Sequence, residues 1–502
     1  MTRISGDFRR TDGMVKPMHG VGNAPLLGTD DKLFHFLGEA GIPFSRLHDT
    51  GGRYGGGCFV DIPNVFRNWD ADPDREDSYD FAFTDWLLTA LHRQGVEPFY
   101  RLGVTIENSW SIKAYHIFPP ADPLKWARVC AGVIRHYNEG WANGYHFGIR
   151  YWEIWNEPDN EPDPARNPMW QGTKEDYFRL YETTSNYLKS RFPSLRIGGY
   201  AGCGFYALSE ADYAAMAKSS TRTGYFVEFF HEFLRYISSP AHKSPLDFFS
   251  WHSYAGVPET AAYARYARDT LDSYGFTHTE NILNEWNRGL GLRGTARDAA
   301  EIAAMFCAMQ AGPVDLCVYY DGQVNTAYGG LFNPLTEDVF PAYYAFRAFN
   351  ELYKRREYVH LASENGVYAA GATDGQTAAA LLSNSGDTPA AVSLEWRGLP
   401  GECARWRAVD ERYAQPGEAF PLQAGGLSRA VTLPPGMETG RRSSGWVRRS
   451  RSTAKRVVTH MMMVAREAVL MRGRKKSLPR KGAKRTRAAE AQMQRVGVPY
   501  LG

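Results

Sequence analysis

Short apolar runs alternate along the chain with longer segments of helical periodicity. The short runs are rich in Val, Ile, Tyr, Phe and Trp, as is typical of strands buried on both faces. Eight such runs occur, at residues 15–20, 43–49, 96–103, 149–156, 195–201, 246–254, 281–287 and 314–321. Between them, apolar residues recur at i, i+3 and i+4, which predicts helices over residues 31–40, 81–94, 123–137, 174–192, 225–237 and 296–310.

This alternation indicates an α/β protein with a parallel sheet. Eight strand–helix units within about 350 residues predict a (β/α)8 TIM barrel with elaborated loops. An open, doubly wound sheet is the alternative, but no GxGxxG motif follows the first strand run.

The pattern changes after the helix predicted over residues 341–355. Alternating runs such as GVYAAGA, TAAALLSN and AAVSLEWR are separated by turn signals, which predicts a small, sandwich-like antiparallel β-domain. We therefore expect three parts: a catalytic barrel at 1–355, a β-domain at 356–436 and a basic, disordered tail at 437–502. An apolar patch in the tail, residues 457–471, has an amphipathic helix as its alternative interpretation.

The net charge of +3 hides a strong asymmetry. From Arg441 to the end there are 18 Lys and Arg residues but only 2 acidic ones, so the rest of the chain is acidic. Such a tail favours weak contact with nucleic acid or another anionic surface, or else it is an extension unrelated to function.

The six cysteines are scattered and form no CxxC or metal-ligand spacing. Reduced, buried thiols suit a reducing compartment. The N-terminal segment has no apolar core of a signal peptide, and no apolar run reaches the length of a membrane span. We expect a cytoplasmic protein without a membrane span.

Polar and charged residues gather where the predicted strands end. In a barrel these ends meet at one mouth, where active sites lie. The residues concerned are His48-Asp49, Glu107-Asn108, Asn156-Glu157-Pro158, His252-Ser253-Tyr254, Asn284-Glu285-Trp286 and Tyr319-Tyr320-Asp321. Any one of them could be a solvated or capping residue, but their joint occurrence points to a site.

Two glutamates at these ends, Glu157 and Glu285, each follow an asparagine. Such a pair suits glycoside hydrolysis, in which one carboxyl protonates the departing oxygen and the other attacks the anomeric carbon or activates water. A hard-cation site is the main chemical alternative, but the many aromatics and the lack of a phosphate loop disfavour it. We expect neither a metal nor a cofactor.

The motifs WEIWNEPD and ILNEW, together with PPADPLKW, RLHD, DFFSWHSY and PAYYAFRAFN, resemble glycoside hydrolase family 39 over residues 15–355. That family contains retaining β-xylosidases and α-L-iduronidases built on (β/α)8 barrels. The resemblance implies that Glu157 is the acid/base and Glu285 the nucleophile. It further implies contacts to a glycoside or oligosaccharide substrate from His48, Asn156, His252, Tyr254 and Asp321, with Asn156 bonding the 2-hydroxyl of the sugar.

The remaining acids of this region are assigned other roles. An acid/base must hold a proton near neutral pH, so we expect the pKa of Glu157 to be raised. Glu153 lies four residues earlier on the same face of the strand and is expected to be a structural partner. Asp159 falls in a Pro-rich loop and is expected to be solvated or to cap the next helix, a calcium loop being the less favoured alternative.

The resemblance also bears on the sugar. Iduronidases carry a lysine where this chain has Tyr254, which favours a neutral glycone and a β-xylosidase-like, retaining exo-glycosidase. An iduronidase-like enzyme remains an alternative because Arg46, Arg53 and Arg288 could bind a uronate. Other β-glycosidase activities and a carbohydrate-binding pseudoenzyme also stay open. The loop at 48–70 is a candidate wall for exo action, and the family allows a homo-oligomer.

Overall fold

The computed structural model describes residues 1–27, 30–49, 60–106, 117–209, 221–325, 328–364, 366–409, 415–433 and 460–466. The chain divides into two compact units, Met1–Glu467 and Ala468–Gly502, and the second lies outside the described residues.

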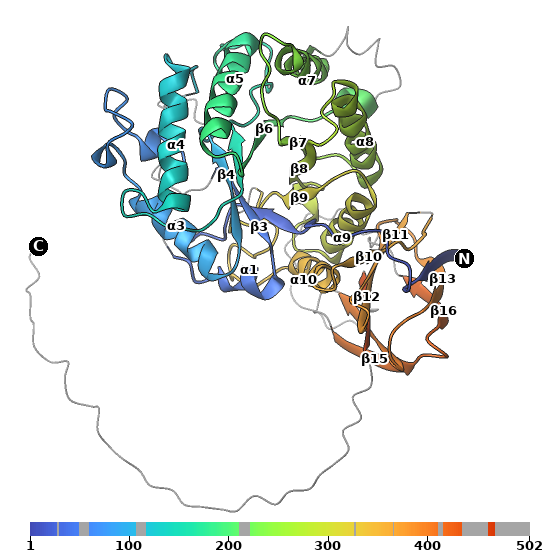
Figure 1. Ribbon diagram of the computed structural model, residues 1–502. Helices are drawn as coiled ribbons and strands as arrows, with labels where there is room; N and C mark the ends of the chain where they lie inside the picture. Colours follow the sequence, from blue (N-terminus) through green and yellow to red (C-terminus); the bar gives the residue numbers. More distant parts are fainter. Residues whose placement is uncertain are drawn as a thin grey trace, which may run out of the picture. The chain divides into compact units, whose positions relative to one another are not determined.

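A closed barrel of parallel strands forms the centre of the first unit, as predicted (Figure 1). Its strands are β2 (Gly20–Gly22), β3 (Phe44–Leu47), β4 (Glu97–Leu102), β5 (Tyr151–Ile154), β6 (Arg196–Gly202), β7 (Phe248–Ser253), β8 (Glu280–Trp286) and β9 (Leu316–Tyr319). Pairing of β2 with β9 closes the barrel, with Gly20 opposite Val318. The first strand begins later than the predicted 15–20, because Pro17 cannot donate a hydrogen bond to a neighbouring strand. The sequence pattern did not predict β2 itself, because glycine is not typical of strands.

Helices surround this barrel. They are α1 (His35–Ala40), α2 (Ile62–Val65), α3 (Ala82–Arg93), α4 (Pro123–Glu139), α5 (Lys174–Arg191), α7 (Thr221–Ser238), α8 (Val257–Ser273), α9 (Ala296–Ala311) and α10 (Pro341–Tyr353). Local sequence explains several starts: α5, for example, begins with a capping box between Thr173 and Asp176. In the described part of the chain, no helix is both long and apolar enough to cross a membrane.

The side chains inside the barrel change from apolar to charged along the barrel axis. An apolar cluster at the strand starts includes Phe44, Phe99, Tyr151 and Phe248. Since strand side chains alternate between two faces, the residues two positions further on share this orientation. They are Arg46, Arg101, Glu153 and Ser250, all at most 1% exposed. The charged layer of the barrel therefore lies toward the carboxyl ends of the strands, directly below the predicted site.

Two sheets make up the smaller β-structure. One has the order β1-β13-β16 and the other β10-β11-β12-β17-β14-β15. The strands are β1 (Thr2–Asp7), β10 (Glu357–Val359), β11 (Val367–Thr373), β12 (Thr377–Asn384), β13 (Ala390–Arg397), β14 (Cys403–Val409), β15 (Gln415–Pro421), β16 (Leu427–Leu433) and β17 (His460–Arg466). A second apolar cluster, which includes Ile4, Leu394, Trp396 and Leu382, fills its interior.

Two strands of this β-structure correct the predicted boundaries. β1 pairs in parallel with β13, so the first residues of the chain belong to the β-structure and not to the barrel. β17 pairs with β12 on one side and β14 on the other, so this part of the predicted tail is a strand rather than a disordered or helical segment. Both pairings join segments far apart in sequence, which periodicity alone cannot reveal. The rest of the predicted tail, 437–459 and 467–502, lies outside the described residues.

Candidate active site

The loop after β5 carries Glu157 on a strained backbone. Trp155 and Glu157 both have positive φ, 72° and 44°, which is unfavourable for residues with a Cβ. Burial of the Trp155 ring, whose indole nitrogen donates to the Met169 carbonyl at 2.9 Å, helps to hold this conformation. The backbone N–H of Glu157 donates to the Ala201 carbonyl of β6 at 3.0 Å. The side chain of Glu157 therefore does not follow the two-faced alternation of the β5 side chains, and these contacts fix the position of its backbone.

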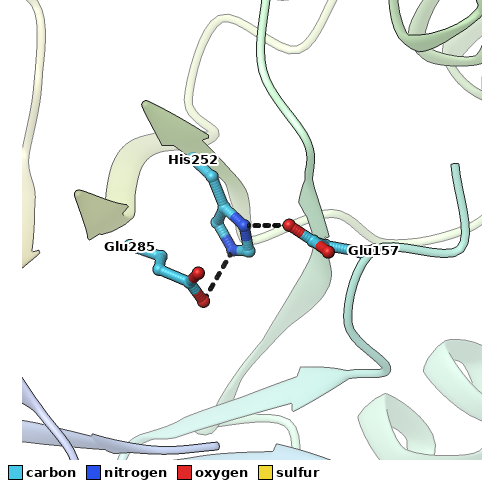
Figure 2. Close-up of side chains that lie close together, drawn as sticks. All are labelled: Glu157, His252 and Glu285. Atoms are coloured by element: carbon cyan, nitrogen blue, oxygen red, sulfur yellow. Dashed lines mark hydrogen bonds and ion pairs between the residues drawn. The ribbon is translucent and has the colours of Figure 1, made fainter. Parts of the chain in front are cut away.

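The two predicted glutamates meet across a histidine (Figure 2). Nδ1 of His252 lies 2.8 Å from Oε1 of Glu157, and its Nε2 lies 3.6 Å from Oε2 of Glu285. One carboxylate oxygen of each glutamate and one ring nitrogen of His252 all lie within 4.8 Å of one another. His252 is 1% exposed, whereas the side chains of Glu157 and Glu285 keep 14% and 9% of their surface. Both glutamates thus keep some exposure to solvent, which the imidazole between them lacks.

A buried network supports this pair from below. Glu153 accepts hydrogen bonds from Arg46 Nε at 2.8 Å, from Ser250 at 2.6 Å and from Asn284 at 2.5 Å. It is fully buried, which agrees with the predicted structural role. A buried carboxylate with this many donors is compensated for its lost hydration.

Arg46 connects this network to the site. Its Nη1 lies 3.1 Å from Oε2 of Glu285, and its Nη2 donates to Oδ1 of Asn156 at 2.5 Å. Tyr254 approaches Glu285 from the other side and donates its hydroxyl to Oε1 at 2.5 Å. Both carboxylate oxygens of Glu285 therefore have hydrogen-bond donors. The bond from Arg46 to Oδ1 fixes the orientation of the Asn156 amide.

His48 and Asp321 lie in the same end of the barrel but are more deeply covered, at 3% and 1% exposure. Asp321 accepts hydrogen bonds from Asn23 Nδ2 and the backbone of Gln323, both at 3.2 Å. Burial together with the nearby Arg101 and Arg46 keeps the pKa of His48 well below its usual value, so its imidazole is neutral. Asp49, next in the chain, accepts a hydrogen bond from Tyr320 at 2.8 Å and has a φ of 55°.

The direction of the pKa shift at Glu157 contradicts the prediction made from its role. Burial opposes charge on both groups, but the hydrogen bond and charge of His252 lower the pKa of Glu157 below its ordinary value. Glu285 and Glu157 in turn raise the pKa of His252 despite its burial. The expectation of a raised pKa at Glu157 is therefore wrong for this arrangement, because the hydrogen bond and charge of His252, 2.8 Å away, outweigh the effect of burial.

Asp159 also corrects a prediction. It is 1% exposed and accepts hydrogen bonds from the backbone N–H of Cys203 at 3.1 and 3.3 Å, so it is neither solvated nor a cap of the next helix. Burial and the nearby charge of Glu157 raise its pKa to about 7. The Pro-rich motif around Asp159 does not signal this, since its hydrogen-bond partner Cys203 lies after β6, 44 residues away.

Glu157, His252 and Glu285 have the spacing of a three-ligand metal site. A histidine ligand, however, must be neutral and turn a lone pair toward the metal. The raised pKa of His252 favours the imidazolium, in which both ring nitrogens carry protons and face carboxylates. An imidazole between two carboxylates therefore suits a proton shared among these residues better than a bound metal ion.

Comparison with known proteins relates part of the chain, which includes Glu157 and His252, to a family. Residues 52–272 match the family described as "Glycosyl hydrolases family 39", which confirms the resemblance predicted from the motifs. Two curated relatives, both described as "Beta-xylosidase", come from Geobacillus stearothermophilus and Caldicellulosiruptor saccharolyticus. Each is 29% identical, over 167 and 171 residues. The matches span 31% of the length of each relative, and 31% and 32% of this chain.

Solved structures with the same fold include three that act on sugars according to their descriptions. A glucosidase from Croceicoccus marinus has a TM-score of 0.71 at 17% identity, covering 93% of this chain and 99% of its own. A β-xylosidase from Caulobacter crescentus has a TM-score of 0.62 at 17% identity, covering 93% and 100%. A bacterial orthologue of human α-L-iduronidase has a TM-score of 0.61 at 13% identity, covering 94% and 84%. At these identities the likeness concerns the fold.

Proposed function

We propose that this protein is a retaining exo-glycosidase that removes a terminal β-linked sugar, with Glu157 as acid/base and Glu285 as nucleophile. The observation that carries the proposal is the closeness of the two carboxylates, which have oxygens within 4.8 Å of one another. Retaining enzymes hold their carboxyl groups about 5–5.5 Å apart, whereas inverting enzymes leave about 6.5–9.5 Å for a water molecule.

In the first step, Glu285 attacks the anomeric carbon while Glu157 protonates the glycosidic oxygen. The required proton is held by the His252–Glu157 pair and reaches the carboxylate across their 2.8 Å hydrogen bond. In the second step the ionised Glu157 takes a proton from water, which attacks the anomeric carbon and frees Glu285. Asn156, oriented by Arg46, is placed to donate its amide to the 2-hydroxyl of the sugar.

A neutral glycone, with xylose as the first candidate, suits the charges at this end of the barrel. A uronate would need cations, but Arg46 is 1% exposed and engaged by Glu153, Glu285 and Asn156. Arg288 is paired with Glu301 at 3.2 Å. The third predicted candidate, Arg53, lies outside the described residues, as does much of the loop proposed as the exo wall.

The test is hydrolysis of an aryl β-xyloside by the wild type and by Glu285→Ala, with Glu161→Gln as a matched control. Glu161 lies in the same loop as Glu157 but pairs with Arg166 at 2.7 Å, outside the network described above. We expect release only from the wild type and the control. A 2-fluoro-xyloside should leave a sugar bound to Glu285, detectable by mass spectrometry of the peptides. Equal release by Glu285→Ala and the wild type would refute the assignment.

A second experiment tests the role of Glu157. Glu157→Ala with sodium azide should form a xylosyl azide of β configuration, because azide replaces the water that Glu157 activates. An α-configured product would instead indicate inversion and contradict the double displacement.

A further inference from the structure

The carboxylate of Glu157 is held on its second oxygen as well as on its first. While Oε1 faces His252, Oε2 accepts a hydrogen bond from Nδ2 of Asn160 at 2.6 Å. Asn160 lies in the same loop and is 8% exposed. Its amide could in principle rotate, so the strength of this contact depends on what holds the amide.

Arg222 of α7 provides that hold. Its Nη2 donates to Oδ1 of Asn160 at 2.7 Å, and its Nε donates to the backbone carbonyl of the same residue, also at 2.7 Å. Two bonds from one planar guanidinium fix both the backbone and the side chain of Asn160. A cation on the amide oxygen also polarises the amide, which makes Nδ2 a better donor to a carboxylate.

We propose that Asn160, held by Arg222, is a positioning residue that fixes the carboxylate of Glu157. The pair works as a clamp: it bridges an outer helix to the loop after β5 and orients the acid/base. This inference rests on the proposed function, in which Glu157 exchanges a proton with the glycosidic oxygen. A carboxyl that swings away from that oxygen loses the geometry on which proton transfer depends.

Several other groups act on Glu157 and must be considered in any titration. They are His252 of β7, Asp159 of the same loop, Cys203 after β6, Tyr206 of the short helix η2 (Tyr206–Ser209), Tyr254 after β7, and Tyr328. Glu285 of β8 acts on His252 and so bears on the pair. The hydrogen bond from Asn160 acts with His252 and Cys203 to lower the pKa of Glu157, whereas the carboxylate of Asp159 disfavours its charge. Loss of the clamp should therefore move the Glu157 titration to higher pH.

The experiment compares Asn160→Ala and Arg222→Ala with Arg166→Ala. Arg166 is a matched control because it pairs with Glu161 and Asp163 of the same loop and is 68% exposed. The carboxyl titration of Glu157 is followed by NMR of protein with 13C-labelled glutamate, the signal being assigned by its loss in Glu157→Gln. We expect its midpoint to rise in Asn160→Ala and Arg222→Ala and to stay in place in Arg166→Ala.

Kinetics provide the second readout. For an aryl β-xyloside with a poor leaving group, kcat/KM should fall about tenfold or more in both clamp variants. For the dinitrophenyl xyloside, which departs without a proton, kcat/KM should change little. Equal losses for both substrates, or an unmoved Glu157 titration in folded variants, would overturn the proposal.

Arg222 is exposed on α7, so its replacement leaves the core intact and keeps the test open if Asn160→Ala folds poorly. A wild type that cleaves neither glycoside would refute the proposed function. The carboxyl titration would still decide whether the clamp exists.

Discussion

The imidazole of His252 lies between the two carboxylates of the site, with Nδ1 2.8 Å from Glu157 and Nε2 3.6 Å from Glu285. Both carboxylates raise the pKa of this histidine against the effect of burial. Replacing Glu157 by Gln removes a charge and a charged acceptor. The midpoint of the His252 titration should therefore fall, which 15N NMR of the imidazole can measure. Glu161→Gln should leave the midpoint unchanged, and an equal shift in both variants would contradict this pairing.

Tyr254→Phe should lower kcat/KM while the fold is kept. The variant loses the hydroxyl that donates to Oε1 of Glu285 at 2.5 Å and little else. A hydrogen bond to a charged group contributes about 1.5–3 kcal/mol, so we expect a loss of roughly 10- to 100-fold with an aryl β-xyloside. A variant as active as the wild type would show that this hydroxyl does not support the role proposed for Glu285.

Glu153→Ala should destabilise the protein strongly. The change leaves Arg46, Ser250 and Asn284 without their shared buried acceptor, and breaking a buried ion pair costs about 3–5 kcal/mol. Denaturant unfolding measures the loss. Asp74→Ala is the matched control because it breaks an exposed pair with Arg128, for which we expect at most about 1 kcal/mol. Similar losses in both variants would contradict a supporting role for the buried network.

Asp159→Asn should stabilise the protein increasingly as the pH rises. Burial and Glu157 raise the pKa of Asp159 from 3.8 to about 7, so between these values the folded state holds a proton that the unfolded state has lost. In this window the wild-type residue makes stability fall with rising pH. An uncharged Asn removes that dependence. The difference in Tm between variant and wild type should therefore grow from about pH 4 to pH 7 and then level off. A difference that does not vary with pH would refute the raised pKa.

Truncation should distinguish the two parts of the predicted tail. Ending the chain after Glu467 keeps β17 and removes only the second compact unit, so we expect the Tm to stay the same. Ending it after residue 436 removes a strand that lies between β12 and β14 and leaves their ladder groups unpaired. This shorter chain should unfold at a lower temperature. Equal Tm values for both truncations would show that β17 adds nothing to stability.

Local patterns in the sequence were sufficient to predict the barrel and to place the two glutamates at one end of it. Period-two and helical patterns are properties of neighbouring residues, and parallel strands bring their carboxyl ends together. Asn156-Glu157 and Asn284-Glu285 could therefore be assigned to one mouth before any distance was known. The same reasoning placed Glu153 below the site, where the structure finds it fully buried.

Only the tertiary structure determined the pKa shifts at the site, the burial of its loop residues and the partners that are distant in sequence. The pKa of Glu157 is lowered and that of His252 is raised because titratable groups from distant segments, including Glu285, meet there. Asp159 is buried and accepts hydrogen bonds from the backbone of Cys203, 44 residues away, and Asn160 is held by an arginine 62 residues away. β1 and β17 join sheets whose other strands are distant in sequence. Each of these depends on contacts between remote segments, for which residue spacing along the chain carries no signal.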